Sequence, residues 1–150
     1  MEPKFKSADD MVRSMWRELG FYIVFDEEKN EIRVEADSAG LLSFAKLFRD
    51  YGTDPDTIEV GHEHLGPYSD PTIITGTEKK CTEKYIQGTQ SDFLALALEV
   101  ETEAGRMSPG ESYFSQHFCN SSGIRIRFHL QKAGFDPCTA DPLLQDEAKT

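Results

Sequence analysis

The stretch FYIVFDEEKNEIRVEADSAGLLSFAKLFRDY, residues 21–51, decides the fold of this chain. Its first half contains two β-rich runs, 21–26 and 31–36, and the second run alternates apolar and charged residues. The polar link at 27–30 is typical of a solvated turn between strands. This half therefore predicts a β-hairpin with one apolar face.

The second half, residues 38–51, repeats apolar residues at helical spacing. Asp37 or Ser38 is suited to cap the start of this helix, and Gly52 is expected just past its end. The helix and the hairpin each have an apolar face that is unstable when exposed. We therefore expect the helix to pack across the hairpin.

The flanking segments add a helix at 7–19, which Ser7 starts and Gly20 ends. Residues 62–71 are rich in glycine, proline and polar residues and predict an exposed loop. The remaining β-rich runs predict strands at 57–61, 72–75 and 123–130.

Residues 93–102 give conflicting signals. Leu94, Leu96, Leu98 and Val100 recur at every second position, which favours a strand. The alanine, leucine and glutamate content of the same segment favours a helix. We predict a strand, because spacing reports the buried face more directly than propensity does.

Together these elements predict an α+β domain with a mostly antiparallel sheet and two helices packed on one face. The length of 150 residues suits one domain. We assign residues 1–135 to this domain. Residues 136–150, with two prolines and several charges, are predicted to form a flexible C-terminal tail.

The formal net charge of −11 indicates the kind of partner. Such a surface repels nucleic-acid backbones and anionic lipids and attracts a basic protein. The alternative is that the acidity only keeps the protein in solution. The sequence shows no apolar run long enough to span a bilayer and no export signal, so we expect a cytoplasmic protein.

The most distinctive segment is GHEHLGPYSD, residues 61–70, which gathers two of the four histidines, two carboxylates and a tyrosine. Side chains of this kind in a loop often contact partners. The candidate partner-binding residues are His62, Glu63, His64, Pro67, Tyr68 and Asp70.

A small metal-dependent enzyme is the alternative interpretation. His62 and His64 lie two residues apart, so in an extended backbone both imidazoles point to one side, where they are placed to bind a transition metal. Asp70 or His129 would supply a third ligand. The spacing fixes no third ligand, so we assign neither metal nor cofactor to the chain.

The sequence gives weaker indications of catalysis for the cysteines and for the arginines of the predicted strand at 123–130. The cysteines Cys81, Cys119 and Cys138 are odd in number and no two are closely spaced, so they indicate neither a disulfide framework nor a structural zinc site. Cys119 lies two residues from His117, which leaves a nucleophilic role open. Arg125 and Arg127 share a strand face and are expected to form surface ion pairs. We therefore predict no catalytic residues.

The order of elements before and within the 61–70 segment adds one resemblance. A hairpin, an amphipathic helix, a short strand and then His62-Glu63-His64-Leu65-Gly66-Pro67-Tyr68 resemble small bacterial immunity proteins of polymorphic toxin systems. The resemblance covers about residues 21–75. It implies binding and neutralisation of a cognate toxin, without catalysis.

Overall fold

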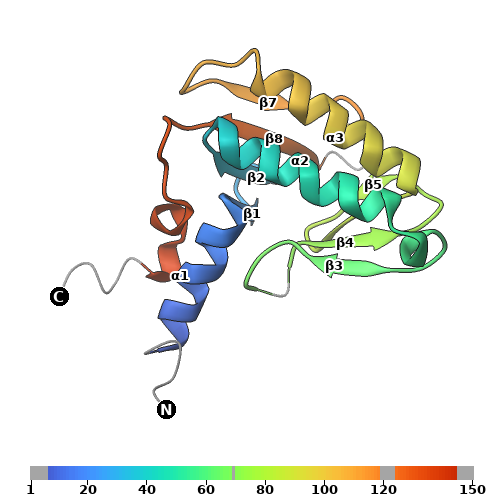
Figure 1. Ribbon diagram of the computed structural model, residues 1–150, viewed down its shortest axis with the longest axis horizontal. Helices are drawn as coiled ribbons and strands as arrows, with labels where there is room; N and C mark the ends of the chain where they lie inside the picture. The colour runs from blue at the N-terminus through green and yellow to red at the C-terminus, as the bar shows by residue number, and fades with distance from the viewer. Residues whose placement is uncertain (1–6, 69, 119–123, 145–150) are drawn as a thin grey trace.

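The computed structural model describes residues 7–68, 70–118 and 124–144 (Figure 1). The strands of this part of the chain form two four-stranded sheets, with the orders β1-β2-β8-β7 and β3-β4-β6-β5. The helices are α1 (Ala8–Leu19), α2 (Ser38–Thr53) and α3 (Gln90–Ala104), with 3-10 turns η1 (Pro55–Thr57) and η2 (Pro137–Ala140). The strands are β1 (Phe21–Asp26), β2 (Glu31–Ala36), β3 (His62–His64), β4 (Thr72–Thr75), β5 (Lys80–Cys81), β6 (Tyr85–Gly88), β7 (Ser112–Phe114) and β8 (Arg125–Leu130).

This architecture confirms the predicted α+β class and the mostly antiparallel pairing. The pairs β1–β2, β7–β8, β3–β4 and β5–β6 are antiparallel, whereas β2–β8 and β4–β6 are parallel. The strands divide between two sheets, and buried Ile73 of β4 and Ile86 of β6 belong to the same apolar core as the buried residues of β1, β2 and β8. Among the described residues, no helix is long and apolar enough to cross a membrane.

The predicted hairpin is confirmed. In β1 and β2 the register places Ile23 opposite Val34, and both side chains are buried. β8 then pairs with β2 in parallel, so the predicted strand at 123–130 is present from Arg125, and residue 123 lies outside the described part. The alternating pattern of β2 directs one side of this sheet toward the helices.

The predicted helix at 38–51 is confirmed as α2. Its N-cap is Asp37, whose carboxylate accepts the Gly40 N–H at 2.8 Å. Phe44 packs on the sheet, with ring centroids 5.3 Å from Phe21 and 5.2 Å from Phe128. The helix continues to Thr53, so the prediction that Gly52 lies past its end is wrong.

The strand predicted at 93–102 is wrong, because this segment is the middle of α3. A capping box joins Thr89 and Asp92 at its start. The buried residues, Phe93, Leu96, Ala97, Val100 and Ala104, follow helical spacing. Leu98, which the two-residue alternation placed on the buried face, is 61% exposed. The helical propensity of the alanines, leucines and glutamates prevails here.

The strand predicted at 57–61 is also wrong. Pro55 and the Asp54 carboxylate, which accepts the Asp56 N–H at 2.9 Å, start the short turn η1 instead. The strand begins at His62, inside the segment that we predicted to be a loop. The β-branched residues Ile58 and Val60 are exposed, so no buried face holds them in a sheet.

The flexible tail predicted at 136–150 does not begin at residue 136. η2 packs beside α1, and Cys138, Asp141 and Leu144 are buried (Figure 1). The Asp141 carboxylate accepts the indole N–H of Trp16 at 2.9 Å and the hydroxyl of Tyr68 at 2.5 Å. These long-range bonds, which no local pattern reveals, fix the segment; residues 145–150 lie outside the described part.

Candidate partner-binding surface

The most distinctive predicted segment begins with strand β3 at the edge of its sheet. β3 pairs with β4 on one side, with Glu63 opposite Ile73. The side chains of His62, Glu63 and His64 are all exposed, whereas Leu65, directly after them, is fully buried and anchors the strand. An edge strand with three exposed polar side chains is a surface suited to contact.

The histidine side of β3 faces α1. The rings of His62 and His64 lie with their centroids 5.7 Å apart, and His64 Nδ1 lies 3.0 Å from the Thr72 hydroxyl. His64 also lines a hollow of about 210 Å³ with Met15, Leu19, Glu18 and Gly66. His64 thus lies beside a small, partly apolar recess.

The metal alternative required a third ligand beside this pair. No group of three or more histidine, cysteine, aspartate or glutamate residues in the described ranges is placed to hold a metal ion. His129, one of the expected ligands, belongs to β8 of the other sheet, where its Nδ1 lies 2.8 Å from the Ser112 hydroxyl. The described residues therefore give the metal alternative no support.

Glu63 points to the opposite side of β3, toward the end of α2. Its pKa is raised, first by burial of part of the side chain and then by the negative charges of Asp50 and Asp54. Beneath it the Tyr51 hydroxyl lies 2.7 Å from the Thr75 hydroxyl. Burial raises the pKa of Tyr51, and the charges of Glu63 and Asp54 raise it further. The charges of Asp50 and Asp54 thus act on Glu63 from this side.

Two exposed apolar residues complete this surface. Ile58 is 58% exposed and Val60 is 74% exposed, in the short link between η1 and β3. Asp56 and Glu59 beside them are exposed as well. We call this surface the acidic edge; its members are Asp50, Asp54, Asp56, Ile58, Glu59, Val60, His62, Glu63 and His64.

Local contacts hold some members of the acidic edge in place. Asp50 forms an ion pair with Lys46 at 2.7 Å on the exposed face of α2. Asp54 caps η1, and Gln90 of α3 donates to the Asp54 carbonyl at 2.6 Å. Sequence reasoning missed Asp50, Asp54, Ile58 and Val60. Asp50 and Asp54 affect Glu63 only through the fold, whereas Ile58 and Val60 lie in the link directly before β3.

The other predicted partner-binding residues, Pro67, Tyr68 and Asp70, differ in their exposure. Asp70 is exposed, whereas Pro67 and Tyr68 are half-buried. Burial and the bond to Asp141 raise the pKa of Tyr68 well above its ordinary value. Tyr68 also packs against Trp16, with ring centroids 6.0 Å apart. The Tyr68 hydroxyl is therefore used inside the protein, and this residue supports the fold.

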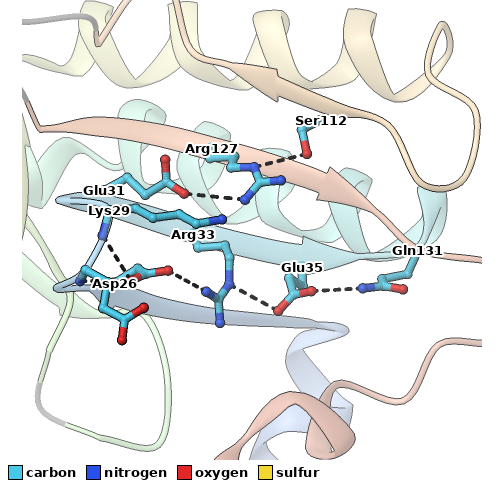
Figure 2. A network of polar contacts seen from close by, with 9 residues as sticks. Asp26, Lys29, Glu31, Arg33, Glu35, Ser112, Arg127 and Gln131 are labelled. Atoms are coloured by element: carbon cyan, nitrogen blue, oxygen red, sulfur yellow. Dashed lines mark hydrogen bonds and ion pairs between the residues drawn. The ribbon is translucent and has the colours of Figure 1, made fainter.

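Arg127 of β8 and Arg33 of β2 lie in a polar network on the face of the β1-β2-β8-β7 sheet that α2 does not cover (Figure 2). Arg127 lies 3.5 Å from Glu31 and donates to Ser112 at 3.1 Å. Figure 2 shows Arg33 between Asp26 and Glu35, at 2.8 and 3.2 Å. Arg127 is ion-paired as expected, but its partner Glu31 is buried, so the pair does not lie on the open surface. Arg125 instead lies over the Phe114 ring, at 3.9 Å.

His117 forms a separate acid–base pair. Its Nε2 lies 3.0 Å from an Asp92 oxygen, and its backbone N–H donates to Glu99. Cys119, the nucleophile considered with it, lies outside the described residues. Burial raises the pKa of Asp92, but hydrogen bonds from Thr89 and His117 outweigh burial, and the pKa falls below its ordinary value.

We expect the Asp92–His117 pair to make the free energy of unfolding depend on pH. A lowered folded-state pKa means that the contribution of Asp92 is fully present above the pKa of the unfolded chain. The contribution is lost as pH falls through the folded-state pKa. Urea unfolding at about pH 7 and at about pH 3 measures how far the free energy of unfolding falls with acidification. This fall should be smaller for Asp92→Asn than for the native protein. Equal losses in the two proteins would contradict this account.

The exposed acidic edge is thus the feature of the described residues best suited to bind another molecule. Two further hollows, of about 410 and 420 Å³, adjoin Gly134 and Phe135, and neither has a histidine or cysteine in its lining. No protein-family model, curated protein or solved structure matches this chain.

Proposed function

We propose that this chain is a non-catalytic protein-binding domain of the immunity type, which neutralises a basic toxin partner in the cytoplasm. The observation that carries the proposal is the acidic edge. There, the charges of Asp50 and Asp54 act on Glu63 of β3, and two exposed apolar side chains, Ile58 and Val60, lie in the link that leads into β3. A centre of apolar contacts with charged groups around it is typical of protein–protein interfaces.

The electrostatics of this surface favour a basic partner. The chain carries a net charge of −11, and long-range attraction speeds the encounter with a positively charged protein. The pKa of Glu63 is raised first by partial burial of its carboxylate and then by the negative charges of Asp50 and Asp54. A lysine or arginine placed beside Glu63 would relieve that repulsion, so binding of a basic group is favourable here.

The described titratable groups support binding more than turnover. Burial raises the pKa of Cys81 to about 12, and burial with the nearby Asp136 raises that of Cys138 to about 11. Neither thiol is poised to act as a thiolate near neutral pH. The His117 imidazole is bound to Asp92 at the start of α3. These groups stabilise the fold.

The test is co-expression with the product of a toxin-like gene directly upstream. We expect the native chain to rescue growth. The double variant Asp50→Lys/Glu63→Lys should lose rescue, with association to the purified toxin slowed about tenfold or more at low salt. The matched control is Glu27→Lys/Glu28→Lys, the same charge change in the exposed turn between β1 and β2.

The control variant should bind and rescue nearly as well as the native chain. Equal losses in both double variants would mean that net charge alone acts, and the acidic edge would lose its role. Failure of the native chain to rescue growth from every neighbouring toxin would overturn the proposed function.

A further inference from the structure

The open side of β3 offers backbone groups for pairing. Thr75 N–H donates to the Gly61 carbonyl and Leu65 N–H donates to the Pro71 carbonyl, both at 3.0 Å. In an antiparallel pair, alternate residues direct both backbone groups to the same neighbour. Gly61, Glu63 and Leu65 therefore face β4. The backbone groups of His62 face the other way, toward the outer edge of the sheet, where β3 is the outermost strand (Figure 1).

The two sides of β3 differ in chemistry. On the α2 side lie the carboxylates of Glu63, Asp50 and Asp54. On the α1 side lies the partly apolar recess of about 210 Å³, which Met15, Leu19, Gly66, His64 and the carboxylate-bearing Glu18 line. Met15 is 36% exposed, and methionine side chains adapt readily to a bound apolar group. A strand beside β3 would direct successive side chains alternately to these two sides.

We propose that the partner is bound through an extended segment that alternates basic and apolar residues and pairs with β3 as an added strand. Its lysine or arginine side chains face Glu63, Asp50 and Asp54, and its apolar side chains face the recess beside Met15 and Leu19. This inference rests on the proposed function and names the kind of partner segment that the acidic edge accepts. Addition of a strand to a sheet edge is a general mode of peptide recognition.

The short length of β3 limits how many backbone hydrogen bonds an added strand can form. The side chains on the two sides of β3 must therefore supply the selectivity. A strand of three residues gives few backbone bonds, and short edge strands avoid unselective pairing. The carboxylates on one side of β3 and the partly apolar recess on the other then select the partner. A segment that is acidic, or basic without alternation, lacks one of the two matching sides.

The experiment uses the full chain labelled with ¹⁵N and a synthetic peptide that alternates lysine and valine. We expect amide shifts concentrated at residues 58–64 and slower hydrogen exchange at the His62 amide on binding. A peptide of the same composition, with all lysines before all valines, should bind about tenfold more weakly. Equal binding of both peptides, or shifts elsewhere on the chain, would overturn strand addition.

A pair of variants separates backbone from side chain. His62→Pro removes the outward N–H of β3 at an edge position where proline is tolerated. His62→Ala keeps that N–H and removes only the imidazole. We expect His62→Pro to weaken binding about tenfold and His62→Ala to leave it nearly unchanged. Equal effects of the two substitutions would overturn strand addition.

The His62→Pro protein must keep native far-ultraviolet dichroism. Should it not fold, exchange protection at His62 in the native chain still decides the question. The proposed function has a separate outcome. If the upstream toxin binds and Asp50→Lys/Glu63→Lys abolishes rescue while the His62 amide stays unprotected in the complex, strand addition fails and the proposed function stands.

Discussion

Replacement of Gly40 by alanine should destabilise the protein by about 3 kcal/mol, near the upper end for overpacked sites. A Cβ at this position would lie 2.0 Å from the Gly20 carbonyl oxygen and 2.8 Å from the Ala36 Cβ. These neighbours belong to the chain reversal after α1 and to the end of β2, so neither moves easily. Gly20 itself has φ +81° and ends α1, with its N–H donating to the Trp16 carbonyl.

The expected sign is informative because alanine is the better helix former. In an exposed helix the same change would stabilise by up to about 1 kcal/mol. A loss of stability would therefore mean that the free-energy cost of the clash exceeds the gain in helix propensity. The control is Gly105→Ala at the end of α3, where a new Cβ meets only one atom, at 3.6 Å. Denaturant unfolding of both variants measures the difference, and a Gly40→Ala protein as stable as Gly105→Ala would refute the close contact.

Replacement of Asp141 by alanine should cost about 3 kcal/mol, because buried donors lose their acceptor. Asp141 is 1% exposed, and its two oxygens accept from the Trp16 indole, the Tyr68 hydroxyl and the Leu143 N–H. These bonds join α1, the link after β3 and the segment after η2. Their loss should free α1 and the C-terminal segment together.

Trp16 is the only tryptophan, so its fluorescence reports on this cluster directly. We expect a red shift and easier quenching in Asp141→Ala, with faster amide exchange in α1. Asp141→Asn keeps one acceptor oxygen and should lose less stability. A control at exposed Glu111, which accepts the Ser108 N–H, should change neither signal. An unshifted spectrum in Asp141→Ala would show that the carboxylate does not hold Trp16.

The secondary structure followed from local sequence where two independent signals agreed. The hairpin, α1 and α2 each combined apolar periodicity with turn or cap residues, and all three are present. At 93–102 the signals disagreed, and spacing misled because Leu98 faces solvent. The Thr89–Asp92 capping box at the start of this segment was the local signal that would have corrected the assignment.

The candidate site was only partly accessible to sequence reasoning. His62, Glu63 and His64 do lie exposed together, as a strand and not as a loop. Tyr68, chosen for its polar ring, instead completes a buried contact with Asp141, a residue 73 positions away. A tyrosine hydroxyl can form a hydrogen bond either to a partner protein or to a group within its own fold. Only the neighbouring residues in the folded chain decide between these two uses.

The sequence by itself determined the class of fold, the hairpin with its helix, and the strong negative charge, because these depend on composition and short-range periodicity. Only the tertiary structure decided which carboxylates gather beside β3, where the chain after Asp136 packs, and which edge of a sheet stays open. Those outcomes depend on contacts between residues far apart in the chain. The free energy of these contacts arises from burial of apolar surface and from charge interactions, and neither can be read from a short stretch of sequence.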